Sequence, residues 1–251
     1  MKYIEKHFDT DIVRRHKKEL QDGKLDKDSL LQRKKSEEKL RGSELFEQVK
    51  SRKMIPHVED LWKQMIDEQG GICCYCGCIL VENGKSIEHV KPKSKYIELV
   101  GEYENLLYSC RPSEKEEGDV KRNVEKQKRS EYFHCDKQKD DKEIPITPLV
   151  ENCEQQFIYT LEGTVEAANG SEAANKTIEI LNLNCKTLVK QRLTAINTIL
   201  FADDSDWQKI SQTIMNRPDG IYREFCFVIR NVIDNYAGDI WKGGKGEIKH
   251  K

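Results

Sequence analysis

The stretch Ile72-Cys73-Cys74-Tyr75-Cys76-Gly77, followed shortly by Ile87-Glu88-His89-Val90, decides the expected fold of this 251-residue chain. A Cys-x-x-Cys pair delivers two thiolates from one tight turn, which is a common first half of a tetrahedral metal site. An acidic residue beside a histidine at the end of a short apolar strand supplies a cation ligand and a base. The two motifs within one short interval predict a small metal-stapled module that hydrolyses phosphodiester bonds.

Four cysteines are the expected zinc ligands. Cys73 and Cys76 form the first pair, Cys110 is the natural third ligand, and Cys135 is the fourth. The charged segment 111–134 separates the last two. We expect it to loop out, because the entropy of closing a loop grows only slowly with loop length. The sequence therefore predicts one structural Zn²⁺ ion on these sulfurs, with no part in bond breaking.

Other uses of the cysteines remain open at this point. Cys74 and Cys78 form a competing Cys-x-x-x-Cys pair, and His134 is an alternative to the neighbouring Cys135. The plainest alternative is a set of buried free thiols, which is how isolated cysteines are usually found. That interpretation is preferred for the three cysteines without a partner at metal-binding spacing, which are Cys153, Cys185 and Cys226.

The candidate catalytic residues follow from what phosphodiester hydrolysis needs, namely a deprotonated water and a cation near the phosphate. His89 can act as the base because imidazole titrates near neutral pH, and Glu88 offers the hard oxygen that Mg²⁺ or Mn²⁺ prefers. Neighbouring strand residues point to opposite faces, so the pair can share one site only where the strand bends, as Lys91-Pro92 allows. Asn105 could hold the imidazole or the water, and Asp136 could supply a second metal oxygen. For an isolated histidine or glutamate, the alternative is a surface or hydrogen-bonded core position.

The charge balance limits how nucleic acid could be bound. A formal net charge of -1, with 35% charged residues, excludes a general polycation, so binding would need local basic patches. Such runs are most often solvated helix faces, but two of them flank the candidate site. The residues expected to contact phosphates are Lys91, Lys93, Lys95, Lys121, Arg122, Lys128 and Arg129.

The expected location is the cytoplasm, without membrane attachment. No apolar run is long enough to span a bilayer, and the first residues do not resemble a signal peptide. The cytoplasm keeps thiols reduced, so nine cysteines in that compartment favour metal binding over disulfides.

The expected fold class is α+β, mainly α. Residues 1–70 are predicted to be helical, with N-caps at 9–11 and 28–29 and an end at Gly70-Gly71. Asn83-Gly84 predicts a hairpin turn between strands 78–81 and 86–90. Further along, the pattern predicts a helix opening at 135–139, a hairpin around Glu162-Gly163, and amphipathic helices at about 171–182, 185–200, 204–216 and 219–237. The predicted regions are 1–68 (charged and helical), 69–150 (the metal-stapled module) and 151–251 (a hairpin plus helices).

At these residues the chain resembles HNH endonucleases of the ββα-metal fold. More closely, it is similar to the HNH endonucleases of Septu-type and retron-associated antiphage systems. The resemblance covers roughly residues 55–200 and lies in Cys73-x-x-Cys76-Gly77, Ile87 to Pro92, Asn105 to Cys110, His134 to Lys139, Ile146 to Leu149, Cys153 to Gly163 and Ile180 to Asn184.

The resemblance implies site roles and a partner. His89 would be the general base, Glu88 a metal ligand and Asn105 the middle HNH residue, while Asp136 stands where the last position often carries His or Asn. It also implies an ABC/AAA-like ATPase partner in antiphage defence. DNA is the favoured substrate. The alternatives are an RNase, with tRNA as a possible target, and a non-catalytic zinc-binding adaptor.

Overall fold

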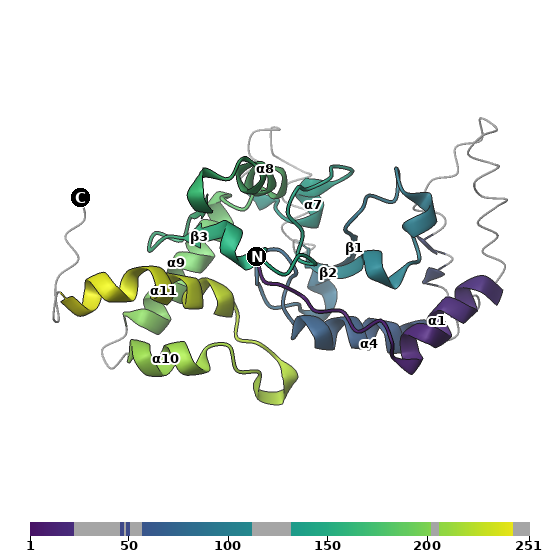
Figure 1. The fold of residues 1–251 in the computed structure, drawn as a ribbon, viewed down its shortest axis with the longest axis horizontal. Helices are drawn as coiled ribbons and strands as arrows, with labels where there is room; N and C mark the ends of the chain where they lie inside the picture. The colour runs from purple at the N-terminus through teal and green to yellow at the C-terminus, as the bar shows by residue number, and fades with distance from the viewer. Residues whose placement is uncertain (23–45, 48, 51–56, 112–131, 202–205, 243–251) are drawn as a thin grey trace.

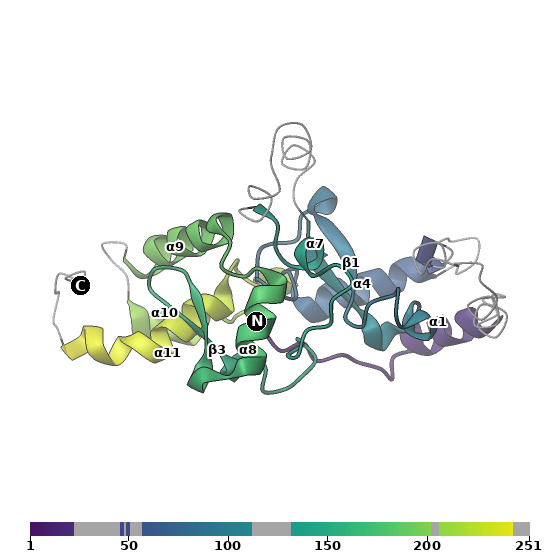
Figure 2. The same ribbon diagram turned by 90° about the horizontal axis from the view of Figure 1, so that it is seen from above.

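The computed structural model describes residues 1–22, 46–47, 49–50, 57–111, 132–201 and 206–242. The described chain is elongated, with α1 (Asp11–Asp22) and α4 (Val58–Gln69) toward one end. The C-terminal helices lie toward the other end, and a small sheet lies between the two groups (Figures 1 and 2). The fold is α+β, as predicted. Along the described parts of the chain, no helix combines the length and the apolarity needed to cross a bilayer.

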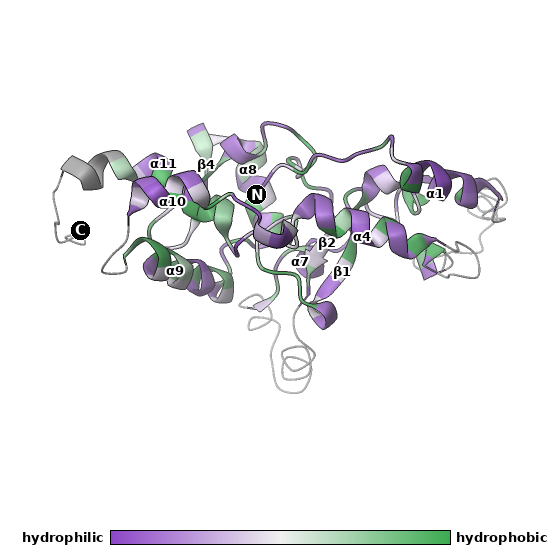
Figure 3. Cartoon of the chain, turned by 90° about the horizontal axis from the view of Figure 1, so that it is seen from below, coloured by the Kyte–Doolittle hydropathy of each residue, from purple (hydrophilic) through white to green (hydrophobic). Residues whose placement is uncertain are grey.

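The N-terminal helices form where the sequence places them. The Thr10 hydroxyl accepts a hydrogen bond from Val13 N at 3.2 Å and so caps α1, and α4 ends at Gly70, whose φ of 60° suits glycine. Figure 3 shows hydrophilic residues over most of α1 and mixed residues along α4, as expected of helices with one buried face. The helix predicted after residues 28–29 lies outside the described residues.

Residues 1–7 are extended, so the prediction of helix throughout 1–70 was wrong at its start. Their backbone N–H groups donate hydrogen bonds to distant segments instead. Tyr3 N donates to Glu154 Oε1 at 2.9 Å, and Ile4 N donates to Pro148 O at 2.8 Å. This N-terminal strap runs from the centre of the molecule to α1 (Figure 1).

The central sheet pairs β1 (Lys85–His89) with β2 (Leu106–Cys110) in antiparallel register, with His89 opposite Leu106. The predicted hairpin between 78–81 and 86–90 was therefore wrong. Residues 82–84 form a 3₁₀ turn. The segment before it folds back on the turn that carries Cys73 and Cys76, and Leu80 N donates to Gly71 O at 2.9 Å. The hydrogen bonds between the segment 78–80 and the cysteine turn therefore outweigh the local preference of Asn83-Gly84 for a hairpin.

The C-terminal half follows the predicted order of a hairpin and helices, but the helix predicted at 219–237 begins only at Cys226. β3 (Phe157–Tyr159) and β4 (Val165–Ala167) form the hairpin around Gly163. The remaining helices are α7 (Asp136–Lys139), α8 (Glu172–Leu181), α9 (Lys186–Leu200), α10 (Trp207–Thr213) and α11 (Cys226–Lys242).

Two apolar clusters form the core, and both cross the predicted region boundaries. One joins α1, α4 and the central sheet through residues such as Val13, Leu61 and Leu106. The other joins the cysteine turn to the C-terminal helices through residues such as Cys76 and Val228. The module at 69–150 thus shares one core with each flanking region.

Candidate functional site

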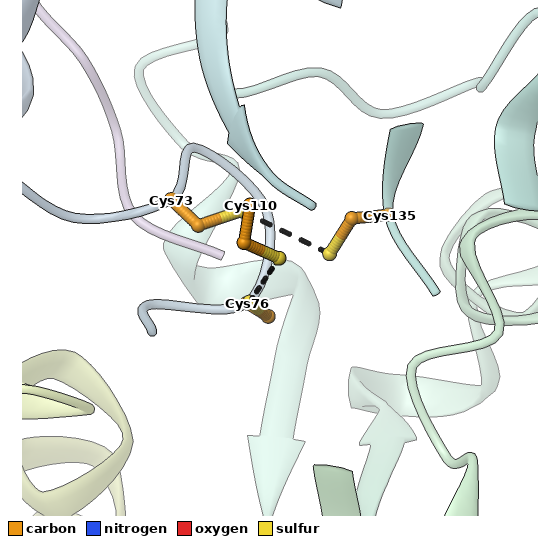
Figure 4. Close-up of side chains that lie close together, drawn as sticks. All are labelled: Cys73, Cys76, Cys110 and Cys135. Carbon is orange, nitrogen blue, oxygen red and sulfur yellow. Dashed lines mark hydrogen bonds between the residues drawn. The ribbon is translucent and has the colours of Figure 1, made fainter. Parts of the chain in front are cut away.

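The four predicted cysteines meet at one point (Figure 4). Their sulfur atoms all lie within 4.8 Å of one another, with 3.8 Å between Cys73 and Cys135 and 3.6 Å between Cys76 and Cys110. The turn is closed by Cys73 N donating to Cys78 O at 2.8 Å. All four side chains are buried.

The donor set fits zinc. A tetrahedron of Zn–S bonds of about 2.3 Å has edges of about 3.8 Å, close to the 3.8 and 3.6 Å that separate two of the sulfur pairs. Among the competing cysteines, Cys78 Sγ instead contacts Gln191 Oε1 at 3.9 Å, and Cys74 is buried outside the four-sulfur group. The choice of 73, 76, 110 and 135 is confirmed as a cluster that could hold a metal ion such as zinc. Cys153, Cys185 and Cys226 are buried free thiols, as predicted.

His134 supports the thiolates from the side. Its Nδ1 lies 3.1 Å from Cys135 Sγ and 3.7 Å from Cys110 Sγ. Burial works to lower the pKa of His134, but hydrogen bonding to thiolate and the negative charge of the sulfurs raise it overall. An N–H at this position donates to sulfur, so the geometry makes His134 a hydrogen-bond partner of the ligand set.

The C-terminus of α8 positions Cys135. Leu181 O accepts a hydrogen bond from Cys135 N at 2.9 Å, and the Asn182 side chain donates to Phe133 O at 2.7 Å. These contacts come from residues far along the chain, which explains how the fourth sulfur reaches the group after the long insertion.

Glu88 and His89 line one cavity of about 650 Å³ together with Asp136, although neighbouring strand residues ordinarily point apart. The chain leaves the strand at this point, because Val90 N donates to Asn105 O at 3.0 Å. The Asn105 side chain fixes the exit further, since its Oδ1 accepts from Lys91 N at 2.7 Å and its amide donates to Lys91 O and Leu99 O. Asn105 therefore holds the main chain beside His89, while the predicted contact with the imidazole or a water is not among its hydrogen bonds to the described residues.

The His89 ring has a defined orientation. Its Nε2 lies 3.0 Å from Val100 O, and the Phe46 ring packs edge-on with centroids 4.5 Å apart. A carbonyl can only accept, so Nε2 carries the hydrogen and the neutral ring keeps its lone pair on Nδ1. Burial lowers the pKa of His89 to about 4, so the ring is neutral at pH 7. A neutral imidazole with an unprotonated Nδ1 is the form that a general base needs.

Glu88 is buried among three polar partners. Its Oε1 accepts from Tyr75 Oη at 2.7 Å and lies 2.8 Å from Lys139 Nζ. Burial raises the pKa of Glu88 to about 8, the adjacent Asp136 carboxylate adds to that rise, and Lys139 opposes it. Asp136 Oδ2 accepts from Ser86 Oγ at 2.8 Å, which holds this second carboxylate at the cavity wall.

Sequence reasoning missed Lys139 and Tyr75. Lys139 is 1% exposed and also donates to His89 O at 2.9 Å. The available signal was its position three residues after Asp136, at the start of a predicted helix, where residues three apart lie on one face. Tyr75 lies inside the cysteine turn, and nothing in the local pattern pairs it with Glu88.

Only some of the residues predicted to contact phosphates line the cavity. Lys93 lines the cavity, but Lys91 and Lys95 lie 2.8 and 4.0 Å from the carboxylate of Glu143. The predicted positions Lys121, Arg122, Lys128 and Arg129 lie outside the described residues. Other cations line the cavity that the prediction did not include, and these are Lys50, Lys85, Arg111 and Lys137. Acidic residues line it as well, so the lining is of mixed charge and not a uniform basic surface.

A second cavity of about 660 Å³ lies between the N-terminal strap and α4. Its lining mixes acidic and basic side chains, and Tyr222 has Lys2 and Arg217 against its ring at 5.2 and 5.0 Å. Glu88, His89, Asp136 and Lys139 all line the first cavity, which therefore has the stronger chemical case. In comparisons with known proteins, no family model and no curated protein matches this chain.

Proposed function

We propose that the protein is an HNH-type endonuclease of the ββα-metal fold that hydrolyses phosphodiester bonds, with DNA as the favoured substrate. The observation that carries the proposal is that His89, whose Nε2 donates to Val100 O and so leaves Nδ1 unprotonated, lines one cavity together with the carboxyl groups of Glu88 and Asp136. Zinc on the four cysteines is the structural part of the proposal, because it fixes the ends of the segments that carry the site.

The chemical roles follow from the positions of the side chains. His89 takes a proton from a water molecule at Nδ1, the atom left free by the bond to Val100. Glu88 and Asp136 offer the hard oxygens that Mg²⁺ or Mn²⁺ binds, and Mg²⁺ commonly uses only one or two protein carboxylates. When bound, such an ion supplies positive charge to the phosphate and the leaving oxygen.

The cations around the cavity hold the backbone of the substrate. Lys93 and Arg111 line the cavity and attract phosphate without reading base sequence. Asn105 acts on the chain beside His89 and positions the base through the main chain. A role in antiphage defence with an ATPase partner is part of the same proposal and rests on the sequence resemblance alone.

The test is cleavage by purified, zinc-loaded protein with Mn²⁺ or Mg²⁺, and with EDTA as the metal-free control. We expect His89→Ala to lower the rate by at least about 100-fold, the usual range for loss of a general base. His57→Ala is the matched control, since His57 is an exposed histidine paired with Glu19 outside this cavity, and it should cleave as the wild type does.

Plasmid DNA and total tRNA are used in parallel, so that a preference for RNA appears as cleavage of tRNA alone. Equal rates for the wild type and His89→Ala would contradict the mechanism. If the zinc-loaded wild-type protein cut neither substrate, the assay would be repeated with the ATPase partner, and continued absence of cleavage would favour a non-catalytic zinc-binding adaptor.

A further inference from the structure

Lys139 occupies the centre of the candidate site. Its side chain is 1% exposed, yet its ammonium lines the cavity of Glu88 and His89. Nζ lies 2.8 Å from Glu88 Oε1 and donates to His89 O at 2.9 Å. A positive charge is therefore already in contact with the carboxylate that would bind a divalent ion.

The contacts of Lys139 differ from those of Lys6, the other lysine that is buried among the described residues. The Lys6 ammonium donates to two main-chain carbonyls, Tyr103 O and Leu106 O, both at 2.7 Å, and lies over the Tyr103 ring. Those bonds fasten one segment of backbone to another. Lys139 donates to one main-chain carbonyl and also contacts the buried carboxyl group of Glu88, so its charge matters as well as its capacity to donate hydrogen bonds.

We propose that Lys139 is the buried hydrogen-bonding partner of the Glu88 carboxyl group in the metal-free protein and that its positive charge opposes the binding of a divalent cation there. The inference rests on the proposed function, because it gives Lys139 a role within the same site. Burying Glu88 without a partner would be strongly unfavourable, and the ammonium relieves that cost while no metal is bound. Lysine suits this task, since its charge sits on a flexible stem that can move when a stronger cation arrives.

Competition of this kind makes the free protein a weak metal binder. A phosphate in the cavity would offer the displaced ammonium a new partner, so nucleic acid and metal would each favour the binding of the other. Lys139 is thus a positioning residue that delays the loading of the site until substrate is present.

The test measures Mn²⁺ binding by electron paramagnetic resonance on zinc-loaded, nucleic-acid-free protein. Lys139→Met and Lys139→Gln should bind Mn²⁺ at least about tenfold more tightly than the wild type, because a like charge in contact with the site has been removed. A proton also competes for the carboxylate, but it carries half the charge of Mn²⁺, so loss of the ammonium favours the ion more. Lys139→Arg keeps the charge and should bind as the wild type does.

Lys137→Met is the matched control. Lys137 is an exposed lysine of the same helix that lines the same cavity, and it lies over the Phe133 ring at 5.7 Å. Its removal should change Mn²⁺ affinity by less than about threefold, as expected of a solvent-screened charge. Zinc content and a melting curve accompany each variant, and Lys139→Gln, which keeps a donor for His89 O, is the decisive variant if Lys139→Met loses zinc.

Unchanged or weaker Mn²⁺ affinity in folded Lys139→Gln would overturn the inference, as would equally tight binding after Glu88→Gln is added to it. The outcome is separate from the cleavage test. Tighter binding in a protein that cuts nothing supports the inference and contradicts the nuclease proposal, whereas cleavage with no change in affinity does the reverse.

Discussion

Around Glu88 several buried side chains are ionisable, whereas around Leu188 the buried side chains are mostly apolar, with Arg192 as a buried cation that donates to main-chain carbonyls. The central region buries Glu88, His89 and Lys139 within one cavity wall and closes on four cysteines. The C-terminal region packs aliphatic and aromatic residues of α8, α9 and α11 against β3. Buried charges oppose folding unless they are paired, and apolar burial favours it. From this difference we expect a metal ion on the four cysteines to contribute much of the stability of the central region, and apolar packing to contribute most of that of the C-terminal region.

The largest expected difference between the two regions appears when one buried thiol is removed from each. Cys76→Ser should lose zinc and unfold the central region, because structural zinc contributes on the order of 10 kcal/mol of folding free energy in small zinc domains. Cys153→Ser, at an equally buried thiol outside the four-sulfur group, should keep its zinc and lose only about 1–3 kcal/mol. Elemental analysis and thermal melting measure both effects. Equal zinc content in the two variants would remove Cys76 from the ligand set.

A change of intermediate size tests the packing of the C-terminal region. Gly163 has a φ of 83°, and a Cβ there would lie 2.5 Å from Val189 O and 2.8 Å from Leu193 N. Gly163→Ala should therefore destabilise the protein by about 1–3 kcal/mol, the usual cost of a strained backbone site, without changing zinc content. Denaturant unfolding measures the loss.

Gly170→Ala is the control for that variant, since Gly170 also has a positive φ, 68°, but nothing lies within 4 Å of its Cβ position. It should be less destabilising than Gly163→Ala. A similar loss in both variants would mean that backbone conformation alone, and not the contact with α9, sets the effect.

The smallest effect concerns Lys6, which fastens the N-terminal strap to the central region. Burial lowers the pKa of Lys6 to about 8, below its ordinary value of 10.5. Between these two values the unfolded chain binds more protons than the folded one, so the free energy of unfolding rises with pH across that window. Relative to Lys6→Met, the wild type should gain on the order of 1 kcal/mol per pH unit from pH 8 upward. Denaturant unfolding at pH 8 and pH 9.5 checks the sign, and a wild-type curve parallel to that of the variant would refute it.

The parts of the fold that the sequence predicted are those set by local pattern. The apolar period predicted α8 to α11, and Glu162-Gly163 marked the hairpin of β3 and β4. The spacing of Cys73 and Cys76 identified the first half of the group of four sulfurs, and the need of a tetrahedral ion for two more ligands pointed to Cys110 and Cys135.

The parts that were not predicted depend on contacts between distant segments. Asn83-Gly84 carries the local signal of a hairpin, yet β1 pairs with β2 and the turn is used elsewhere. A lysine is expected at the surface, yet Lys139 is buried in α7, which begins directly after Cys135. Pairing of Lys91 with Glu143 was equally invisible, since the two are far apart in sequence.

The N-terminal strap has a consequence for the order of folding. Tyr3 and Ile4 bond to Glu154 and Pro148, so these contacts join residues about 150 positions apart. Contacts of such high sequence separation form late, because the entropy of closing a long loop must be lost before the contacts can stabilise the fold. On the ribosome, Tyr3 and Ile4 must wait for the segment beyond 148 to emerge before these contacts can form. A nascent chain would thus lack these contacts throughout much of its synthesis.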